Sequence, residues 1–151
     1  MDSLSTIQLS KDVAAIDAFL AEKGIQAEKA ESGLRYVITK PGTGENCKPG
    51  QIAQVNYAGY MLDGQYFDTS VKEVAQANGL YNEGGRYIPY PVTIDETQVI
   101  KGWHHALKLL NKGAKATVYI PSPLAYGRQQ RSELIVPNSI LVFDLEVVDV
   151  K

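Results

Sequence analysis

The side chains that could do chemistry in this sequence are mainly aromatic, and they come from separate parts of the chain. Its 151 residues include 9 tyrosines, 3 phenylalanines and 1 tryptophan. Five rings fall in five different predicted elements: Tyr57, Phe67, Trp103, Tyr126 and Phe143. A ring-lined pocket needs contributions from separate elements, but large aromatic side chains are usually core residues. The pattern alone leaves both interpretations open.

The usual signatures of nucleophilic, nucleotide-dependent and metal-dependent catalysis are absent. The sequence has no G-x-S-x-G turn, P-loop or dinucleotide fingerprint. Its two histidines, His104 and His105, are adjacent on a predicted helix. Neighbouring helical side chains point about 100° apart, so they cannot jointly chelate a metal within one fold. We expect a solvated histidine face, no metal site and no cofactor.

Hydrophobic periodicity predicts a sheet built around one short helix. Strand patterns occur at residues 34–38, 52–62, 66–68, 90–94, 114–120 and 140–148. A short helix is expected at 102–110, and Asp63-Gly64 gives a hairpin signal. Pro91 makes 90–94 an edge strand. Hairpins around one helix imply an α+β fold with a mainly antiparallel sheet.

An amphipathic helix is predicted ahead of the sheet, over about residues 10–24. Ser10 is a good N-cap candidate, and apolar residues including Ile16 and Leu20 recur at helical spacing. Gly24 suits a left-handed C-terminal cap. The helix must bury its apolar stripe either against its own domain, which we favour, or against another copy of the chain.

Charged residues of this helix are expected to face solvent, and a linker should follow it. The polar face includes Asp12 and Asp17, and residues 26–33 are small and polar. We therefore predict an N-terminal extension over 1–32 and a folded domain over 33–151. The protein should be a monomer, or a dimer through the N-terminal helix.

Five short motifs resemble those of the FKBP-type peptidyl-prolyl cis–trans isomerases, in the correct order. They are Val55-Asn56-Tyr57-Ala58-Gly59, Tyr66-Phe67-Asp68-Thr69-Ser70, Val99-Ile100-Lys101-Gly102-Trp103, Pro123-Leu124-Ala125-Tyr126-Gly127 and Leu141-Val142-Phe143-Asp144-Leu145-Glu146-Val147. One such short motif would be weak evidence of a resemblance, but five in the correct order are strong evidence. The resemblance, to bacterial members with one such domain and a helical extension, implies a five-stranded twisted sheet half-wrapped around one short central helix.

The resemblance also implies an activity, acceleration of Xaa–Pro bond rotation during protein folding, and a site for it. Trp103 would form the pocket floor under the proline ring. The backbone N–H of Ile100 and the hydroxyl of Tyr126 would bind the carbonyls flanking the proline. Asp68 would be the acidic group at the wall, either orienting its neighbours or polarising the carbonyl region. The implied wall and rim residues are Tyr57, Phe67, Tyr90, Val99, Arg131, Ile135 and Phe143.

The implied partners are proline-containing peptides and unfolded proteins, together with macrolides such as rapamycin, whose pipecolinyl ring imitates proline. The connection 69–89 exceeds that of the minimal family member by about a dozen residues, and such long loops are commonly functional or disordered. We propose that it is an ordered flap beside the site; the alternative is a tolerated surface insertion. Two rival functions stay open. One is a catalytically weak module that grips proline-containing segments, and the other is a small-ligand carrier of unrelated fold.

Composition excludes some classes of protein. The net charge of −2 and the pI of about 5.7 argue against a nucleic-acid binder. No apolar run is long enough to span a bilayer, and the single cysteine, Cys47, allows no internal disulfide. The N-terminus lacks a signal-peptide pattern, so the protein is either cytosolic or has lost such a segment. The resemblance to envelope proteins with a similar helical extension favours the periplasm or cell envelope.

Overall fold

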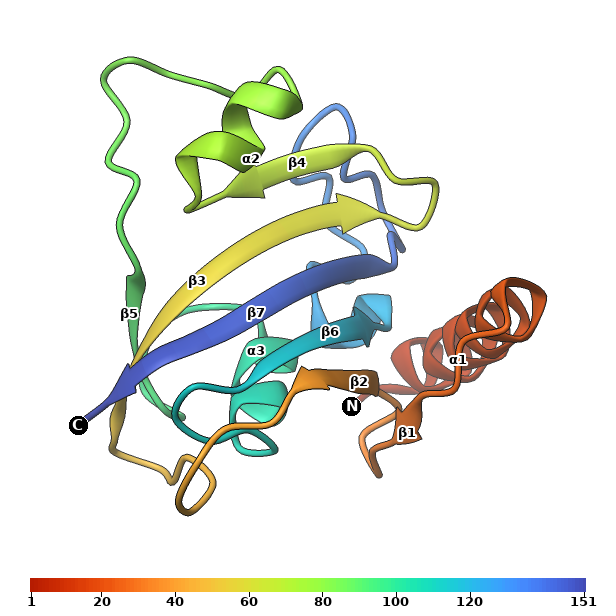
Figure 1. The fold of residues 1–151 in the computed structure, drawn as a ribbon. Helices are drawn as coiled ribbons and strands as arrows, with labels where there is room; N and C mark the ends of the chain where they lie inside the picture. Colours follow the sequence, from red (N-terminus) through yellow and green to blue (C-terminus); the bar gives the residue numbers. More distant parts are fainter.

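Seven antiparallel strands form one twisted sheet in the computed structural model, which describes all residues, 1–151 (Figure 1). The strands are β1 (Glu28–Lys29), β2 (Arg35–Lys40), β3 (Ile52–Met61), β4 (Tyr66–Thr69), β5 (Tyr90–Thr93), β6 (Lys115–Ile120) and β7 (Leu141–Val150). Their order is β1-β2-β6-β7-β3-β4, and β5 pairs with the first half of β3. The α+β fold is as expected, but the strand count is seven rather than five.

Two short strands account for the difference in strand count. β1 lies in the segment that was predicted to be a linker, where Glu28 and Lys29 pair with Tyr36 and Arg35 of β2. Because β1 is only two residues long, it has no apolar alternation that a sequence pattern could detect. β5 was expected as an edge strand, and Pro91 lies within it.

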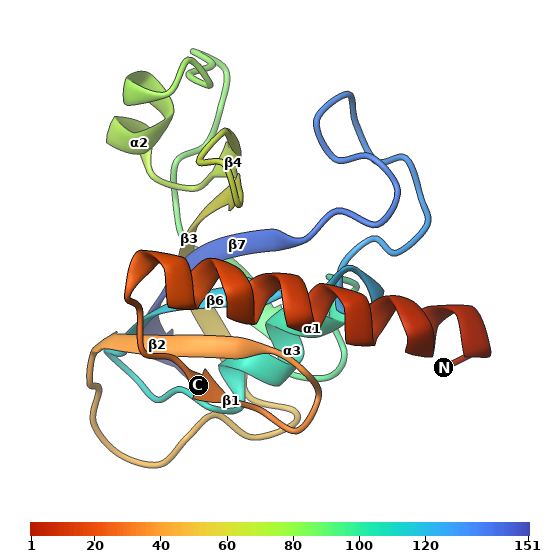
Figure 2. The same cartoon turned by 90° about the vertical axis from the view of Figure 1, so that its right-hand side faces the viewer.

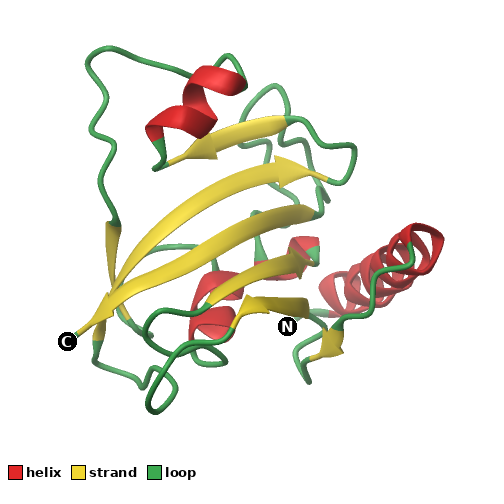
Figure 3. Ribbon diagram, in the orientation of Figure 1, coloured by secondary structure: helices red, strands yellow, loops and turns green.

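Three α-helices and one 3₁₀ turn accompany the sheet (Figure 3). They are α1 (Ser3–Lys23), α2 (Lys72–Ala77), α3 (Lys101–Leu107) and η1 (Ser122–Leu124). None of these helices has the length and apolar character needed to cross a membrane. The helix α2 lies in the connection 69–89, which was predicted to be an ordered flap.

Helix α1 begins seven residues earlier than the sequence pattern predicted. Its N-cap is Asp2, whose carboxylate accepts a hydrogen bond of 2.8 Å from the Ser5 N–H. Ser10 is an interior residue that donates its hydroxyl to the Thr6 carbonyl. The prediction placed the start too late because the first turns carry exposed apolar side chains rather than a continuous buried stripe. The predicted C-cap, Gly24, is confirmed with φ 68°.

The apolar stripe of α1 packs on its own domain, at the end of the sheet formed by β6 and β7 (Figure 2). Ile16 and Leu20 are buried against Tyr119 of β6 and Val142 of β7. Side chains alternate across a strand, so Tyr119 and Val142 point away from the face that carries the main core. The helix therefore covers one end of the outer face of the sheet.

Two carboxylates of α1 that were expected to be solvated bind to the domain instead. Asp12 is only 4% exposed, and its Oδ2 accepts hydrogen bonds from both the backbone N–H and the hydroxyl of Ser122. Asp17 receives Arg35 Nε at 2.9 Å and a second guanidinium nitrogen at 3.1 Å. These bonds from Arg35 hold the pKa of Asp17 below its usual range. A periodicity argument cannot find such contacts, because their partners are distant in sequence.

The inner face of the sheet wraps around α3, where the main core lies (Figure 1). Trp103, Ala106 and Leu107 of α3 are buried together with Val118 and Ile120 of β6. The close approach requires Gly102, because a Cβ there would lie 2.6 Å from Cγ2 of Ile120. Gly102 thus lets the start of α3 press onto β6, which positions the tryptophan that follows it.

Candidate functional site

A cavity of about 220 Å³ opens on the inner face of the sheet, between the start of α3 and the strands β3, β4 and β7. The residues that line it are Tyr57, Phe67, Asp68, Tyr90, Gln98, Val99, Ile100, Trp103, Tyr126, Arg131 and Phe143. The structure therefore brings together all of the site residues expected from the sequence except Ile135. It also adds Gln98, which carries no sequence signal beyond its place before Val99.

Edge-to-face aromatic contacts centred on Trp103 build the floor and walls of the cavity. The Trp103 ring lies 5.1 Å from Tyr57, 5.4 Å from Phe143 and 6.2 Å from Tyr90, measured between centroids. Such tilted pairs are the arrangement that ring quadrupoles favour. Trp103 is 5% exposed, and its buried indole N–H has no hydrogen-bond partner. The tryptophan therefore serves the pocket as a rigid apolar surface rather than as a polar anchor.

Gly59 makes the aromatic wall possible, although it does not line the cavity. It pairs with Asp68 of β4 and Phe143 of β7. A Cβ at this position would lie 2.6 Å from Cζ of Phe67 and 2.7 Å from Cε1 of Phe143. The rings of Phe67 and Phe143 therefore occupy space above β3 that any larger side chain at position 59 would fill.

The polar wall is formed by Asp68 and Tyr57. The Tyr57 hydroxyl donates to Asp68 Oδ2 at 2.8 Å, and the backbone N–H of Thr69 donates to Asp68 Oδ1 at 2.9 Å. Burial, and after it the hydrogen bond to Asp68, raises the pKa of Tyr57. Tyr57 is thus kept as a neutral donor, and the Asp68 carboxylate is fixed in orientation at the wall of a mainly hydrophobic cavity.

The backbone N–H of Ile100 and the hydroxyl of Tyr126, both at the cavity, have no partner within the protein. Ile100 is the N-cap residue of α3, and its backbone N–H forms none of the loop and cap hydrogen bonds. The Tyr126 hydroxyl forms no hydrogen bond with protein atoms, while its ring is covered by the Arg131 guanidinium at 5.2 Å. The cavity therefore offers a backbone donor and a side-chain donor to a ligand that carries acceptor groups.

His104 holds the loop that leads to Ile100, which the sequence did not indicate. Its Nδ1 accepts from the Asp95 N–H at 2.9 Å, so Nε2 carries the proton and donates to the Thr97 carbonyl at 2.8 Å. Both histidines are half-buried, so the prediction of a solvated face was wrong. The reason is that the loop 94–98 folds back over the helix.

Ile135 differs from its expected place at the rim. It is 4% exposed and belongs to the main core. Its carbonyl accepts from the Arg131 N–H at 2.9 Å, and its own N–H donates to Ser132 Oγ at 3.0 Å. Ile135 therefore anchors the turn that carries Arg131, and it supports the rim of the cavity from within the core.

A curved antiparallel sheet around a short helix, with a ring-lined cavity at the start of that helix, defines a small α+β protein with one candidate binding pocket between sheet and helix. Residues 43–148 match the family described as FKBP-type peptidyl-prolyl cis-trans isomerase. This match covers more than half of the chain, and the chain belongs to that family.

Individual relatives agree with this assignment. A probable FKBP-type peptidyl-prolyl cis-trans isomerase FkpA of Neisseria meningitidis serogroup B is 40% identical over 136 residues, which are 89% of this chain and 44% of that protein. FK506-binding protein 1 of Kluyveromyces lactis is 36% identical over 82% of this chain and 98% of its own length. The crystal structure of FkpA from Escherichia coli superposes with a TM-score of 0.70 and 30% identity, over 99% of this chain and 63% of that one. The chain thus spans about half the length of the bacterial relatives it matches.

Proposed function

We propose that the protein is a peptidyl-prolyl cis–trans isomerase that accelerates rotation about Xaa–Pro bonds in folding proteins. The observation that carries the proposal is the ring-lined cavity with two unpartnered donors, the Ile100 N–H and the Tyr126 hydroxyl. Residues 33–151 would form the catalytic domain, and residues 1–32 an extension that packs on it. Unfolded or proline-containing polypeptides would be the substrates.

The physical demands of the reaction match such a cavity. Amide resonance opposes rotation with a barrier of about 18–20 kcal/mol, and Xaa–Pro bonds exchange between cis and trans over tens of seconds or more. The twisted transition state has less charge separation than the planar amide, so an apolar pocket favours it. Fixed donors that bind the flanking carbonyls hold the twisted geometry. Neither a nucleophile nor a metal takes part.

In this mechanism each lining residue has a limited task. Trp103 supports the proline ring, Ile100 and Tyr126 bind the two carbonyls, and Tyr57 and Asp68 orient each other at the wall. The hydrogen bond between Tyr57 and Asp68 supports an orienting role for the carboxylate. The remaining rings exclude water from the twisted bond.

Tyr126→Phe is expected to lower kcat/KM by about threefold to tenfold, the usual value of one hydrogen bond. The free energy of unfolding should change by less than about 0.5 kcal/mol, because the hydroxyl has no protein partner to lose. Asp68→Ala should also weaken catalysis more than stability. The measurement is protease-coupled or NMR exchange turnover of a short Xaa–Pro peptide in the presence of EDTA, alongside urea unfolding.

Tyr66→Phe is the matched control, because Tyr66 lies on the same strand as Phe67 but does not line the cavity. It should leave turnover unchanged. Full turnover in Tyr126→Phe combined with a large loss of stability would contradict the assigned role. A wild-type protein that binds the peptide without accelerating exchange would instead be the catalytically weak binding module. Activity abolished by EDTA would refute the metal-free mechanism.

Rapamycin is expected to bind the same cavity, since its pipecolinyl ring presents the shape of proline between carbonyl groups. The name of the Kluyveromyces relative records FK506 binding for that protein. Saturating ligand should raise Tm by mass action. At a ligand concentration of one hundred times Kd, binding stabilises the folded state by about 2.7 kcal/mol. Thermal unfolding with and without the macrolide tests this, and no shift far above micromolar ligand would show that the rim is closed to it.

The oligomeric state is a separate proposal. Since Ile16 and Leu20 are already buried against the sheet, a dimer through α1 would use its first turns, where Leu4 is 64% and Ile7 is 54% exposed. Sedimentation of the wild type and a Leu4→Ser, Ile7→Ser variant separates monomer from dimer.

A further inference from the structure

A second and larger cavity, of about 540 Å³, lies directly beside the first. It lies between β4, the end of α2 and the segment 80–91, here termed the strap, and is partly open to solvent. Figure 1 shows the strap running from α2 to β5. The two cavities share Tyr57, Phe67, Asp68 and Tyr90 as lining residues. A polypeptide with its proline in the first cavity would therefore pass over these four side chains directly into the second.

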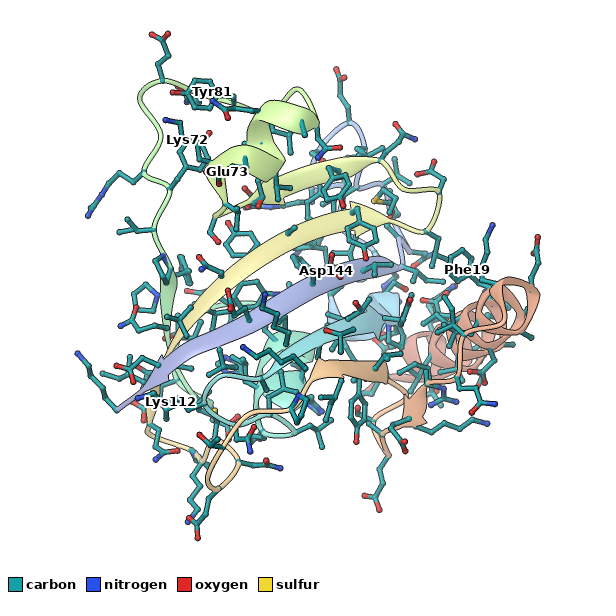
Figure 4. The ribbon with its side chains drawn as sticks, in the orientation of Figure 1. Phe19, Lys72, Glu73, Tyr81, Lys112 and Asp144 are labelled. Atoms are coloured by element: carbon teal, nitrogen blue, oxygen red, sulfur yellow. The ribbon has the colours of Figure 1, made fainter.

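The strap is held by specific contacts. The rings of Tyr81 and Tyr87 stack with centroids 5.7 Å apart and planes 12° apart, and the Tyr87 hydroxyl accepts from the Asn82 N–H at 2.9 Å. Lys72 of α2 lies 5.9 Å above the Tyr81 ring, and Figure 4 shows these two side chains beside each other at the outer end of the strap. The Leu80 N–H donates to the Ala75 carbonyl at 2.9 Å. The cavity thus has an ordered outer wall.

The charges of the second cavity favour one kind of occupant. Its only charged lining residues are Asp68 and Arg86. Asp68 already accepts hydrogen bonds from Tyr57 and Thr69. Arg86 is exposed and belongs to none of the six ion pairs of the protein. Arg86 is therefore the one charged lining residue without a protein partner. A guanidinium presents five donors in a fixed fork that suits a carboxylate, so this residue favours an acidic ligand.

The size of the cavity points to a stretch of chain rather than to one side chain. The first cavity, of about 220 Å³, suits a single ring, whereas the second is more than twice as large. Apolar side chains of the strap and of α2, including Leu80 and Ala75, line its other walls. Extended peptide with an apolar stem and one acidic group fits these surroundings.

We propose that the second cavity is an extended substrate subsite, in which Arg86 binds an aspartate or glutamate side chain close to the isomerised proline. This proposal rests on the proposed isomerase function and adds a substrate class to it. The strap then selects acidic proline-containing segments, while the first cavity performs the rotation.

The test compares proline peptides that carry a single glutamate at successive positions before and after the proline with the same peptides carrying glutamine. At the position that reaches the strap, wild-type kcat/KM should favour glutamate by about threefold to tenfold at low ionic strength, the range for an exposed but charge-assisted contact. The preference should fall as salt is added. Arg86→Gln should abolish it, and Arg86→Glu should transfer it to a lysine-bearing peptide.

Arg128→Gln is the matched control, because Arg128 is an exposed arginine that pairs with Asp2 and lines neither cavity. This variant should keep the wild-type preference. Turnover of a short neutral peptide should be equal in all variants, which isolates the subsite from the catalytic site. Equal kcat/KM for the glutamate and glutamine peptides at every position would overturn the subsite while leaving the isomerase intact. Absence of turnover on the neutral peptide would instead overturn the proposed function.

Discussion

Gly59→Ala is expected to lower kcat/KM by about tenfold or more, although Gly59 does not line the cavity, because misplacing positioned groups is costly. The added methyl would lie 2.6 Å from Phe67 and 2.7 Å from Phe143. Phe143 is 5% exposed, so the rings can yield mainly by turning into the cavity of about 220 Å³. The proline ring would then lose its place between the walls.

The free energy of unfolding of Gly59→Ala should fall as well, because the substitution has a small stabilising effect and a larger destabilising one. Alanine in a strand gains about 0.5–1 kcal/mol over glycine through reduced backbone entropy, whereas overpacking a well-packed core costs about 1–3 kcal/mol. The overpacking term is the larger one. Turnover of a short Xaa–Pro peptide and urea unfolding measure the two consequences.

The control for Gly59→Ala is Gly84→Ala. Gly84 is exposed in the strap, and the nearest atom to an added Cβ is 3.6 Å away, an ordinary contact distance. This substitution should leave turnover unchanged. A Gly59→Ala variant with wild-type turnover would show that the aromatic wall tolerates displacement and that its exact shape is unimportant.

Asp12→Ala is expected to produce the largest loss of stability, about 2–4 kcal/mol, because it leaves two buried donors of Ser122 without an acceptor. It should also reduce kcat/KM by about tenfold. The Ser122 carbonyl accepts from the N–H groups of Ala125 and Gly127, so the turn that presents Tyr126 depends on the position of Ser122. Asp12 thus acts as a positioning residue from outside the predicted catalytic domain.

Two further variants separate positioning from mere stabilisation. Asp12→Asn retains an oxygen acceptor for the Ser122 N–H and should restore much of the activity. Asp17→Asn removes the charge of the ion pair with Arg35 and one of the two acceptor oxygens but lies away from the Tyr126 turn, so it should lower stability without changing kcat/KM. If Asp12→Ala and Asp17→Asn behave alike in turnover, the positioning role is wrong.

The local elements of the domain could be predicted from the sequence because their causes are local. The long strands show apolar alternation, and Gly24 ends α1 with the left-handed cap that its position predicted. The family resemblance also predicted which residues would gather at one cavity, since its motifs fix most of these side chains at known points of a strand or turn. Only Ile135 of that set lies elsewhere, in the core beneath the turn of Arg131.

The features that the sequence left hidden depend on contacts between distant segments. The hydrogen bonds that Ser122 donates to Asp12 join residues that are 110 positions apart. The helical pattern of the sequence identifies Asp12 only as a polar residue. The need for glycine at positions 59 and 102 arises from rings and an isoleucine on other elements.

The sequence by itself determined the long strands, the central helix and the family motifs, because these follow from side-chain type and local spacing. Only the tertiary structure decided that Asp12 of α1 binds Ser122 in the turn before Tyr126 and that the strap lines a second cavity beside the first. The physical reason is that packing and charge pairing depend on which surfaces meet after the chain has folded. Neither the packing nor the charge pairing can be predicted from one segment of the sequence considered alone.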